Sequence, residues 1–225
     1  MSLPDHTAAR DEILGRVRRG VARSDFAARR VAAEAALAAP SRGPQPRMAA
    51  DTAALKVRFA DKATALASSV ESVATLAEAP AAVARYLESH GLAKQAVATA
   101  DVGALDWASA GISVAVRAAV DADMVGISGC FCAVAETGTL LLCSGAGTPA
   151  TVSLLPETHI ALVPVARLVA TMEDAFAMVR AELGDMPRAL NFISGPSRTG
   201  DIEQTIVLGA HGPCRVHLIL IGETS

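Results

Sequence analysis

SGPSRTGDIEQTIVLGAHGP, residues 194–213, lies between two short apolar runs near the C-terminal end of the chain. The two runs, residues 189–193 and 215–221, are rich in aliphatic and β-branched side chains and predict strands. Between them, Ile202 and Ile206 are four residues apart, a spacing that predicts a short helix over residues 201–208. The local prediction is therefore strand, polar turn, short helix, tight turn, strand.

The polar turn places several candidate binding groups after a predicted strand. Ser197, Arg198 and Thr199 would lie at the carboxyl end of that strand, where open α/β sheets bind ligands. Arg198 can hold a carboxylate or phosphate through two parallel hydrogen bonds. Thr199 is the predicted N-cap, and Asp201 and Glu203 would lie in the first helical turn. An ion pair between Arg198 and one of these two acids is an equally good structural interpretation.

A histidine between two glycines ends the same stretch. Gly209 and Gly212 allow a tight backbone around His211 and leave its imidazole uncrowded. His211 is therefore a candidate acid, base or ligand. The structural alternative is a histidine that caps the end of the predicted helix.

The composition favours a globular protein with an aliphatic core. Hydrophobic residues make up 52% of the 225 residues and charged residues 19%, whereas aromatic residues make up only 3%. The net charge of −3 gives no general case for nucleic-acid binding. No leader is visible, and the uncharged residues 137–156 are too rich in glycine and proline for a membrane span, so we expect a cytoplasmic protein.

The four cysteines predict neither a zinc site nor an iron–sulfur cluster in this chain. Cys130, Cys132, Cys143 and Cys214 include no Cys-x-x-Cys pair, and their spacing fits no zinc or ferredoxin pattern. Cysteines in apolar runs are usually small buried hydrophobic residues. We expect no metal and no cofactor in this chain.

The sequence divides at a proline-rich segment. Residues 5–39 are alanine-rich and helical by propensity, with several arginines on one face. That face would dock on an acidic partner or, as the alternative that we favour, be solvated. Residues 40–46, PSRGPQP, break the helix. The predicted domains are a helical arm with its linker, residues 1–46, and an α/β domain, residues 47–225.

The second part of the chain predicts helices first and strands later. Residues 51–91 have helical spacing, with a break at Pro80, and residues 117–122 and 171–183 are further helix candidates. Strands are predicted over 95–99, 111–116, 124–128, 130–135, 139–143 and 159–163. This alternation predicts an α/β fold with a largely parallel central sheet and room for an antiparallel edge.

A glutamate in the middle of the predicted strands is the second candidate site. Charged residues are rarely buried without a partner, and Thr137 and Gly138 let the backbone turn so that the Glu136 carboxylate is exposed. Glu136 is therefore a candidate base, nucleophile or orienting acceptor, with a purely structural role as the alternative. The loop 144–148 is a weak anion-site candidate, and His159 is expected to be a hydrogen-bonded structural residue.

Four motifs in order resemble one known family. They are AETGTL at 135–140, SLLPETHI at 153–160, GPSRTGDIE at 195–203 and GAHGP at 209–213. Together they resemble the LUD-domain family, whose members are lactate utilisation proteins, and the short chain without cluster cysteines is similar to the C-type members. The resemblance covers residues 125–221 and fades toward the N-terminus. It implies a Rossmann-like α/β fold similar to the superfamily of sugar-phosphate isomerases and CoA transferases.

The resemblance also implies a function and partners. The function is a role in oxidising L-lactate to pyruvate, with two iron–sulfur partner proteins that carry the clusters. Many family members have an arginine shortly before the SLLP run, where this chain has residues 148–151, TPAT. If that arginine binds a substrate carboxylate, this chain binds something else or uses Arg198.

Three functions are left open by the sequence. The first is an accessory subunit of a lactate-oxidising complex. The second is a stand-alone enzyme of the CoA-transferase or isomerase kind that uses Glu136, and the third is a sensor of a small hydroxy or keto acid. We expect Glu136, Arg198 and His211 to converge on one cleft. The predicted catalytic residues are Glu136 and His211, and the predicted substrate-binding residues are Thr137, Gly138, Ser197, Arg198, Thr199, Asp201, Glu203 and Gly212.

Overall fold

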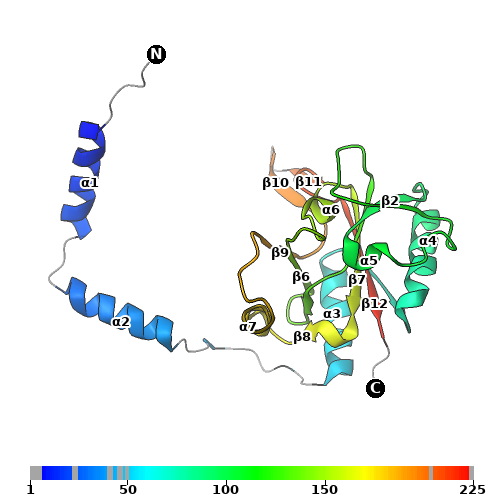
Figure 1. The fold of residues 1–225 in the computed structure, drawn as a ribbon, viewed down its shortest axis with the longest axis horizontal. Coiled ribbons are helices and arrows are strands. Elements are labelled where there is room, and N and C mark those ends of the chain that lie inside the picture. Colours follow the sequence, from blue (N-terminus) through cyan, green and yellow to red (C-terminus); the bar gives the residue numbers. More distant parts are fainter. Residues whose placement is uncertain are drawn as a thin grey trace, which may run out of the picture. The chain divides into compact units, whose positions relative to one another are not determined.

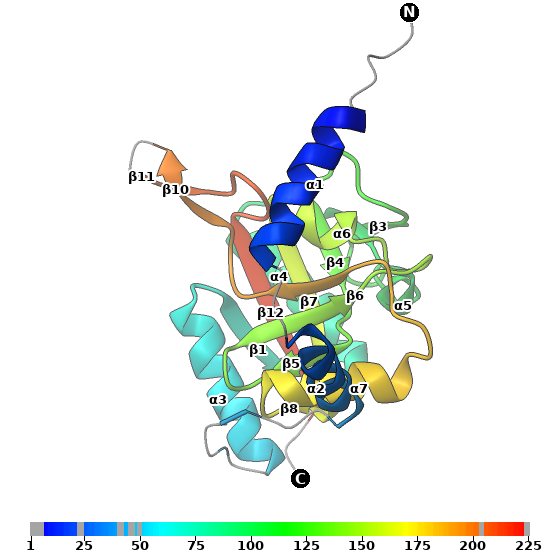
Figure 2. The same ribbon diagram turned by 90° about the vertical axis from the view of Figure 1, so that its left-hand side faces the viewer.

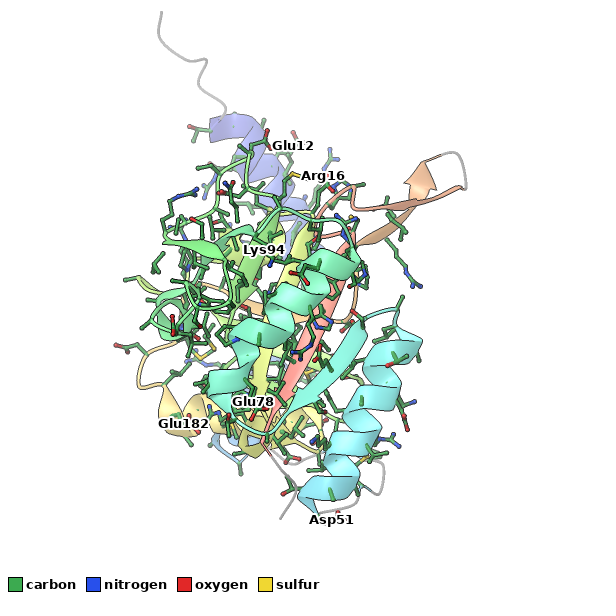
Figure 3. All side chains as sticks on the ribbon, turned by 90° about the vertical axis from the view of Figure 1, so that its right-hand side faces the viewer. Glu12, Arg16, Asp51, Glu78, Lys94 and Glu182 are labelled. Atoms are coloured by element: carbon green, nitrogen blue, oxygen red, sulfur yellow. The ribbon has the colours of Figure 1, made fainter. Side chains whose placement is uncertain are left out.

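The computed structural model describes residues 7–21, 25–39, 43–44, 48, 51–202 and 205–222, and the side chains of 200–202 and 205–207 lie outside this description. The chain separates into two compact units, residues 1–45 and 46–225. The first unit consists of α1 (Thr7–Val21) and α2 (Phe26–Ala38), in which no residue is buried. Figure 3 labels Glu12 and Arg16, which form an i,i+4 ion pair on α1. Most of the predicted linker, residues 40–46, lies outside the described residues.

A six-stranded sheet forms the centre of the second unit. Its strands are β1 (Ser69–Val73), β12 (Arg215–Ile221), β7 (Thr158–Pro164), β4 (Val125–Ser128), β2 (Gln95–Ala98) and β3 (Ser113–Val116), in that order. Every pair of neighbours in the sheet is parallel. The prediction of an α/β fold around a parallel sheet is therefore confirmed.

The prediction of helix throughout residues 51–91 is wrong for its middle part. Residues 52–65 form α3 (Thr52–Ala65) and residues 79–89 form α4 (Ala79–Ser89), but the segment between them contains the strand β1. β1 pairs with β12 from Ser69 opposite His217 to Val73 opposite Ile221. Hydrogen bonding along β12 overrides the helical spacing of Val70 and Val73, because five consecutive backbone positions gain ladder partners.

The two faces of the parallel sheet pack against different layers. Ile160, Leu162 and Ile219 join the core beneath α4, whereas Ala161 and Leu218 join the core beneath α3 and the second sheet. Successive side chains of a strand point to opposite faces, so these strands are apolar on both sides. Figure 3 shows α4 lying across the sheet, with Glu78 and Lys94 near its two ends.

A smaller sheet covers the face opposite α4. Its strands are β8 (Leu168–Val169), β5 (Cys132–Val134), β6 (Thr139–Cys143) and β9 (Leu190–Ile193), in that order, with β5–β6 and β6–β9 antiparallel. The antiparallel pairs thus form a separate sheet instead of the predicted edge. α7 (Met172–Glu182) packs on its outer side, as Figure 1 shows.

Residues 198–208 form a hairpin, so the helix predicted over 201–208 is wrong. β10 (Arg198–Ile202) pairs in the antiparallel sense with β11 (Thr205–Leu208), and Figure 2 shows the hairpin projecting from the body of the second unit. Thr199 is therefore not an N-cap. The short helix predicted over 117–122 is also wrong, because residues 117–120 have no regular structure and 121–122 form a turn.

Candidate functional site

The strand order of the parallel sheet reverses between β2 and β4. β3 pairs with one side of β2 and β4 with the other, and β7 and β12 continue on the side of β4. Two short helices lie beside these strands: α5 (Ala100–Gly103) comes directly after β2, and α6 (Thr151–Leu154) packs on β4. In open α/β sheets, ligands bind outside the carboxyl ends of strands at such a reversal.

A cavity of about 420 Å³ opens at this point of the sheet. Its volume lies within the range of small-molecule sites. The wall consists of residues that follow β2 and β4, of the end of β6 with its loop, and of residues near α6, α7 and β9. The lining residues are Thr99, Asp101, Ser128, Gly129, Cys130, Phe131, Leu142, Cys143, Ser144, Thr148, Pro149, Ala150, Ser153, Arg167, Glu182 and Asn191.

Thr99 and Asp101 form the wall of the cavity next to β2. Thr99 is 3% exposed and occupies the N-cap position of α5, but its side chain does not cap the helix. Within the described part of the chain, its Oγ1 has no hydrogen-bond partner. The Asp101 carboxylate lies against Gly129, where an added Cβ would be 2.2 Å from Oδ2. Gly129 therefore leaves room for this carboxylate.

Arg167 and Glu182, which also line the cavity, form an ion pair. Both Nη atoms of Arg167 donate to the carboxylate of Glu182 at 2.9 Å, and Nε donates to the carbonyl oxygen of Phe131 at 2.7 Å. The guanidinium also lies 4.8 Å from the centroid of the Phe131 ring. The hydrogen bonds from Arg167 lower the pKa of Glu182, so the pair stays charged at neutral pH.

The cysteines at the cavity are protonated thiols. Burial raises the pKa of Cys130 and of Cys143, both of which line the cavity, and it raises the pKa of the neighbouring Cys132 to about 11. The thiolate is the form that attacks electrophiles or binds metals. These groups thus contribute weakly polar surface to the cavity and no charge.

His159 supports the cavity from the interior of the sheet. Its Nε2 lies 2.9 Å from Oγ of Ser128, and that hydroxyl donates to the carbonyl oxygen of Gly129 at 2.8 Å. Since the hydroxyl proton is used, Nε2 carries the proton that it shares with Oγ. Burial lowers the pKa of His159 to about 4, so the ring is neutral. His159 is a hydrogen-bonded structural residue, as its position after a proline turn predicts.

The first predicted cluster lies in the turn between β5 and β6. Glu136 is half-buried, its backbone N–H donates to the carbonyl oxygen of Ala170 at 3.0 Å, and no hydrogen bond or ion pair of its carboxylate is found among the described residues. Gly138 has φ +69°, and an added Cβ would lie 2.4 Å from the backbone nitrogen of Ala63 in α3. Thr137 donates to Thr139 at 2.7 Å.

The second predicted cluster closes the base of the β10–β11 hairpin. Ser197 accepts at its carbonyl from the N–H of Gly209 (3.0 Å) and at Oγ from the N–H of His211 (3.4 Å). Gly212 packs on Ser197, where an added Cβ would lie 3.5 Å from the Cβ of Ser197. The side chains of His211 and Arg198 are exposed. No helix precedes His211, so it does not cap one.

The described contacts bring the two predicted clusters into the same neighbourhood without joining their charged groups. Oγ1 of Thr139 lies 2.7 Å from Oγ of Ser194, at the end of β9, which links the turn of Glu136 to the strand that leads into the hairpin. Thr199 is half-buried in β10. The side chain of Asp201 and the whole of Glu203 lie outside the described residues.

None of the predicted catalytic or substrate-binding residues whose side chains are described lines the cavity, but Ser144 and Thr148 of the loop 144–148, the weak anion-site candidate, do. The sequence signals for the cavity were weak: Thr99 and Asp101 follow a predicted strand, and Ser128 ends another. No local motif joins them, because they come from separate segments that meet only when β2 and β4 become neighbours.

This geometry places the chain in the class of α/β proteins that have a Rossmann-like core and a cavity where the strand order reverses. Residues 55–221 match the model of the LUD domain, and the chain therefore belongs to the LUD-domain family. A crystal structure of a DUF162 family protein from Deinococcus radiodurans is similar, with a TM-score of 0.60 and 25% identity, over 77% of this chain and all of that one.

Curated relatives are similar over part of their length. Lactate utilization protein C of Shouchella clausii is 42% identical over 101 residues, which is 44% of each chain. The protein of the same name from Bacillus subtilis is 38% identical over 102 residues, or 44% of this chain and 42% of that one. The chain thus spans less than half the length of these relatives. Within the described residues, every helix falls short of the length and hydrophobicity that a bilayer crossing requires.

Proposed function

We propose that this chain is an accessory subunit of a system that oxidises L-lactate to pyruvate, acting with iron–sulfur partner proteins. The observation that carries the proposal is the match of residues 55–221 to the LUD domain, together with relatives named lactate utilization protein C. The spacing of the cysteines supports the assignment of the clusters to partner proteins, because Cys130, Cys132, Cys143 and Cys214 fit no ferredoxin pattern. The clusters then belong to the partners.

Deletion of the gene tests this function directly. We expect growth on L-lactate as sole carbon source to be lost and growth on pyruvate to be unchanged, since pyruvate enters after the proposed step. A tagged copy should restore growth and co-purify with proteins that contain iron and acid-labile sulfide. Normal growth on lactate after deletion, with no such protein retained by the tagged chain, would contradict the proposal.

Binding of a small carboxylate at the hairpin base is the second candidate function. It is favoured by the exposed Arg198 beside the closed turn that contains Ser197, His211 and Gly212. In this function the arginine holds the carboxylate, and the hydroxyl of Thr199 in β10 adds a further ligand contact. Calorimetry with L-lactate and pyruvate tests it: Arg198→Gln should abolish the heat of binding, and absence of heat at millimolar ligand for the unaltered chain would exclude it.

Covalent catalysis by Glu136 is the remaining proposal for the first cluster. The carboxylate lies in a turn held by backbone hydrogen bonds, next to Thr137 and Gly138, and is half-buried. The Glu136 carboxylate would attack the carbonyl carbon of a CoA thioester and release the CoA thiolate, and hydroxylamine would trap the resulting acyl-glutamyl anhydride as a hydroxamate. Mass spectrometry should then find the modification on Glu136 and not on Glu157, an exposed glutamate that pairs with Arg215.

A further inference from the structure

The strand β3 ends the parallel sheet and leaves one of its own edges open. Among the described strands it pairs only with β2, from Gln95 opposite Ser113 to Ala98 opposite Val116. An open edge presents a row of backbone donors and acceptors to which a further strand can bond, and proteins usually protect such an edge with charged residues or proline. β3 has the sequence SVAV, without charge or proline, and three of its four residues are exposed.

The hydrogen bonds to β2 decide which backbone groups face the open edge. The N–H of Ser113 donates to the carbonyl oxygen of Lys94 at 2.9 Å, so Ser113 and, two residues on, Ala115 direct their backbone groups toward β2. The N–H and C=O groups of Val114 and Val116 therefore point away from β2. Among the described residues these groups have no hydrogen-bond partner, so both valines offer a donor and an acceptor at the edge.

This pattern is complementary to itself about a two-fold axis. In an antiparallel ladder, opposite residues exchange both backbone hydrogen bonds at every second position. If Ala115 lies on the axis, Val114 of each copy lies opposite Val116 of the other, and every open N–H and C=O group of both edges is used. The two Ala115 residues then form the close pair without hydrogen bonds, with about 4.5 Å between their Cα atoms, where small side chains fit. The opposed valines form β-branched pairs, which stabilise antiparallel strands.

The surface beside the strand is also suited to a second copy. Ser113 and Ala115 line a groove of about 340 Å³ together with Met124, which is 47% exposed. Because Ala115 lines the groove, an axis at this residue brings the grooves of the two copies together. The charged residues at the groove, Arg117 and Asp123, already form two hydrogen bonds with each other, of 2.7 and 2.8 Å. A second copy would therefore cover apolar surface without burying an unpaired charge.

We propose that this chain forms a symmetric dimer in which β3 pairs in the antiparallel sense with β3 of a second copy, with the two-fold axis at Ala115. The two six-stranded sheets then become one continuous sheet. A second copy supplies a strand that is already extended and ordered, so it loses less conformational entropy on binding than a flexible peptide does. The strand contact is short, so we expect a dissociation constant in the micromolar range. The dimer does not depend on a role in lactate oxidation.

Sedimentation velocity of the full chain, from micromolar to nearly millimolar concentration, tests the proposal. We expect the sedimentation coefficient to rise with concentration from the value of a monomer to that of a dimer. Sedimentation as a monomer throughout this range would overturn the proposal, because the edge would then be left to a strand of a different protein.

Val116→Pro tests the hydrogen bonds of the edge. Proline removes the N–H that points away from β2 and leaves the ladder to β2 intact, which is the position where edge strands tolerate it. We expect the dimer to weaken about tenfold or more, whereas Val116→Thr, which keeps the N–H and the branched side chain, should dimerise like the unaltered chain. Circular dichroism confirms that both variants are folded. An unchanged dimer in folded Val116→Pro would refute the pairing.

A charge exchange at Ala115 tests the position of the axis. Ala115→Glu and Ala115→Lys each place like charges opposite each other at the axis, so each variant alone should be monomeric. A mixture of the two should associate about tenfold or more tightly than either alone, because opposite charges then meet. Ser72→Glu adds the same charge at an exposed position of β1, the other edge strand, and should leave the dimer unchanged. Failure of the folded variants to associate when mixed would contradict the proposal.

Discussion

Gly126 lies where α6 packs directly on β4, and it has no room for a side chain. An added Cβ would be 1.9 Å from the carbonyl oxygen of Val152, a backbone atom that cannot move without displacing α6. We predict that Gly126→Ala lowers the free energy of unfolding by about 1–3 kcal/mol through overpacking. Urea denaturation measures the change. Gly184→Ala is the control, because nothing lies within 4 Å of an added Cβ there, and it should change stability by less than about 0.5 kcal/mol.

Two buried histidines make the stability of the second unit depend on pH. Burial lowers the pKa of His159 and of His217 to about 4, against 6.5 in the unfolded chain. Between pH 6.5 and pH 4 the unfolded state binds more protons than the folded state, so stability falls as the pH falls through this window. Each histidine contributes up to about 1.4 kcal/mol per pH unit.

The contribution of the histidines is measured as the slope of the free energy of unfolding against pH. Urea denaturation at pH 7, 6 and 5 should give a free energy of unfolding that becomes smaller as the pH is lowered in the unaltered chain. In His159→Asn, the buried Nε2 donor is replaced by an amide that does not titrate, so the slope between pH 6.5 and 4 should be shallower even if the variant is less stable at pH 7. A slope equal to that of the unaltered chain would show that His159 does not titrate in this range.

At the scale of single elements, α7 depends on its capping box. Oγ1 of Thr171 accepts from the N–H of Asp174 at 3.3 Å, and the Asp174 carboxylate accepts from the N–H of Thr171 at 3.2 Å. We predict that Thr171→Ala lowers the free energy of unfolding by about 1 kcal/mol, because the first turn loses its side-chain acceptor. Thr171→Ser keeps the hydroxyl and should lose less. Equal losses in the two variants would mean that packing of the methyl group, and not capping, stabilises this helix.

The elements that the sequence predicted correctly are those with an apolar pattern long enough to settle their type. β4, β6 and β7 were found as short, mostly apolar runs that are buried at consecutive positions, and α7 was found because its apolar residues recur at helical spacing. The hairpin of β10 and β11 was mistaken for a helix because one pair, Ile202 and Ile206, fits both periods. The β-branched Thr199, Thr205 and Val207 in the same stretch favour strands, and pairing between the two segments decides the outcome.

At the scale of the whole molecule, the sequence predicted the family and the parallel sheet but not the cavity. Motifs such as GPSRTGDIE are contiguous and can be recognised without coordinates. The cavity lies where β2 and β4 are neighbours in the sheet. They are neighbours because β3, which comes between them in the sequence, pairs with the other side of β2. Residues such as Thr99 and Arg167 gain their significance only from this arrangement, because neither belongs to a local pattern.

The division of the chain into two units gives the last prediction. All buried core side chains of the described chain lie from Leu55 onward, and no residue of α1 or α2 is buried. A protein that begins at Pro46 should therefore keep its melting temperature within about 2 °C, because loss of exposed residues changes the free energy of unfolding by less than about 0.5 kcal/mol. Scanning calorimetry of the two proteins makes the comparison.

A longer deletion is the matched control for that experiment. A protein that begins at Ser69 also lacks α3 and with it Leu55, Phe59 and Ala63, which belong to the core between α3 and the sheet. Removing them exposes apolar side chains of β12 and the second sheet, so this protein should lose its cooperative transition. If deletion of residues 1–45 alone lowered the melting temperature by many degrees, the first unit would have to stabilise the α/β unit by direct contact, and the two could not fold independently.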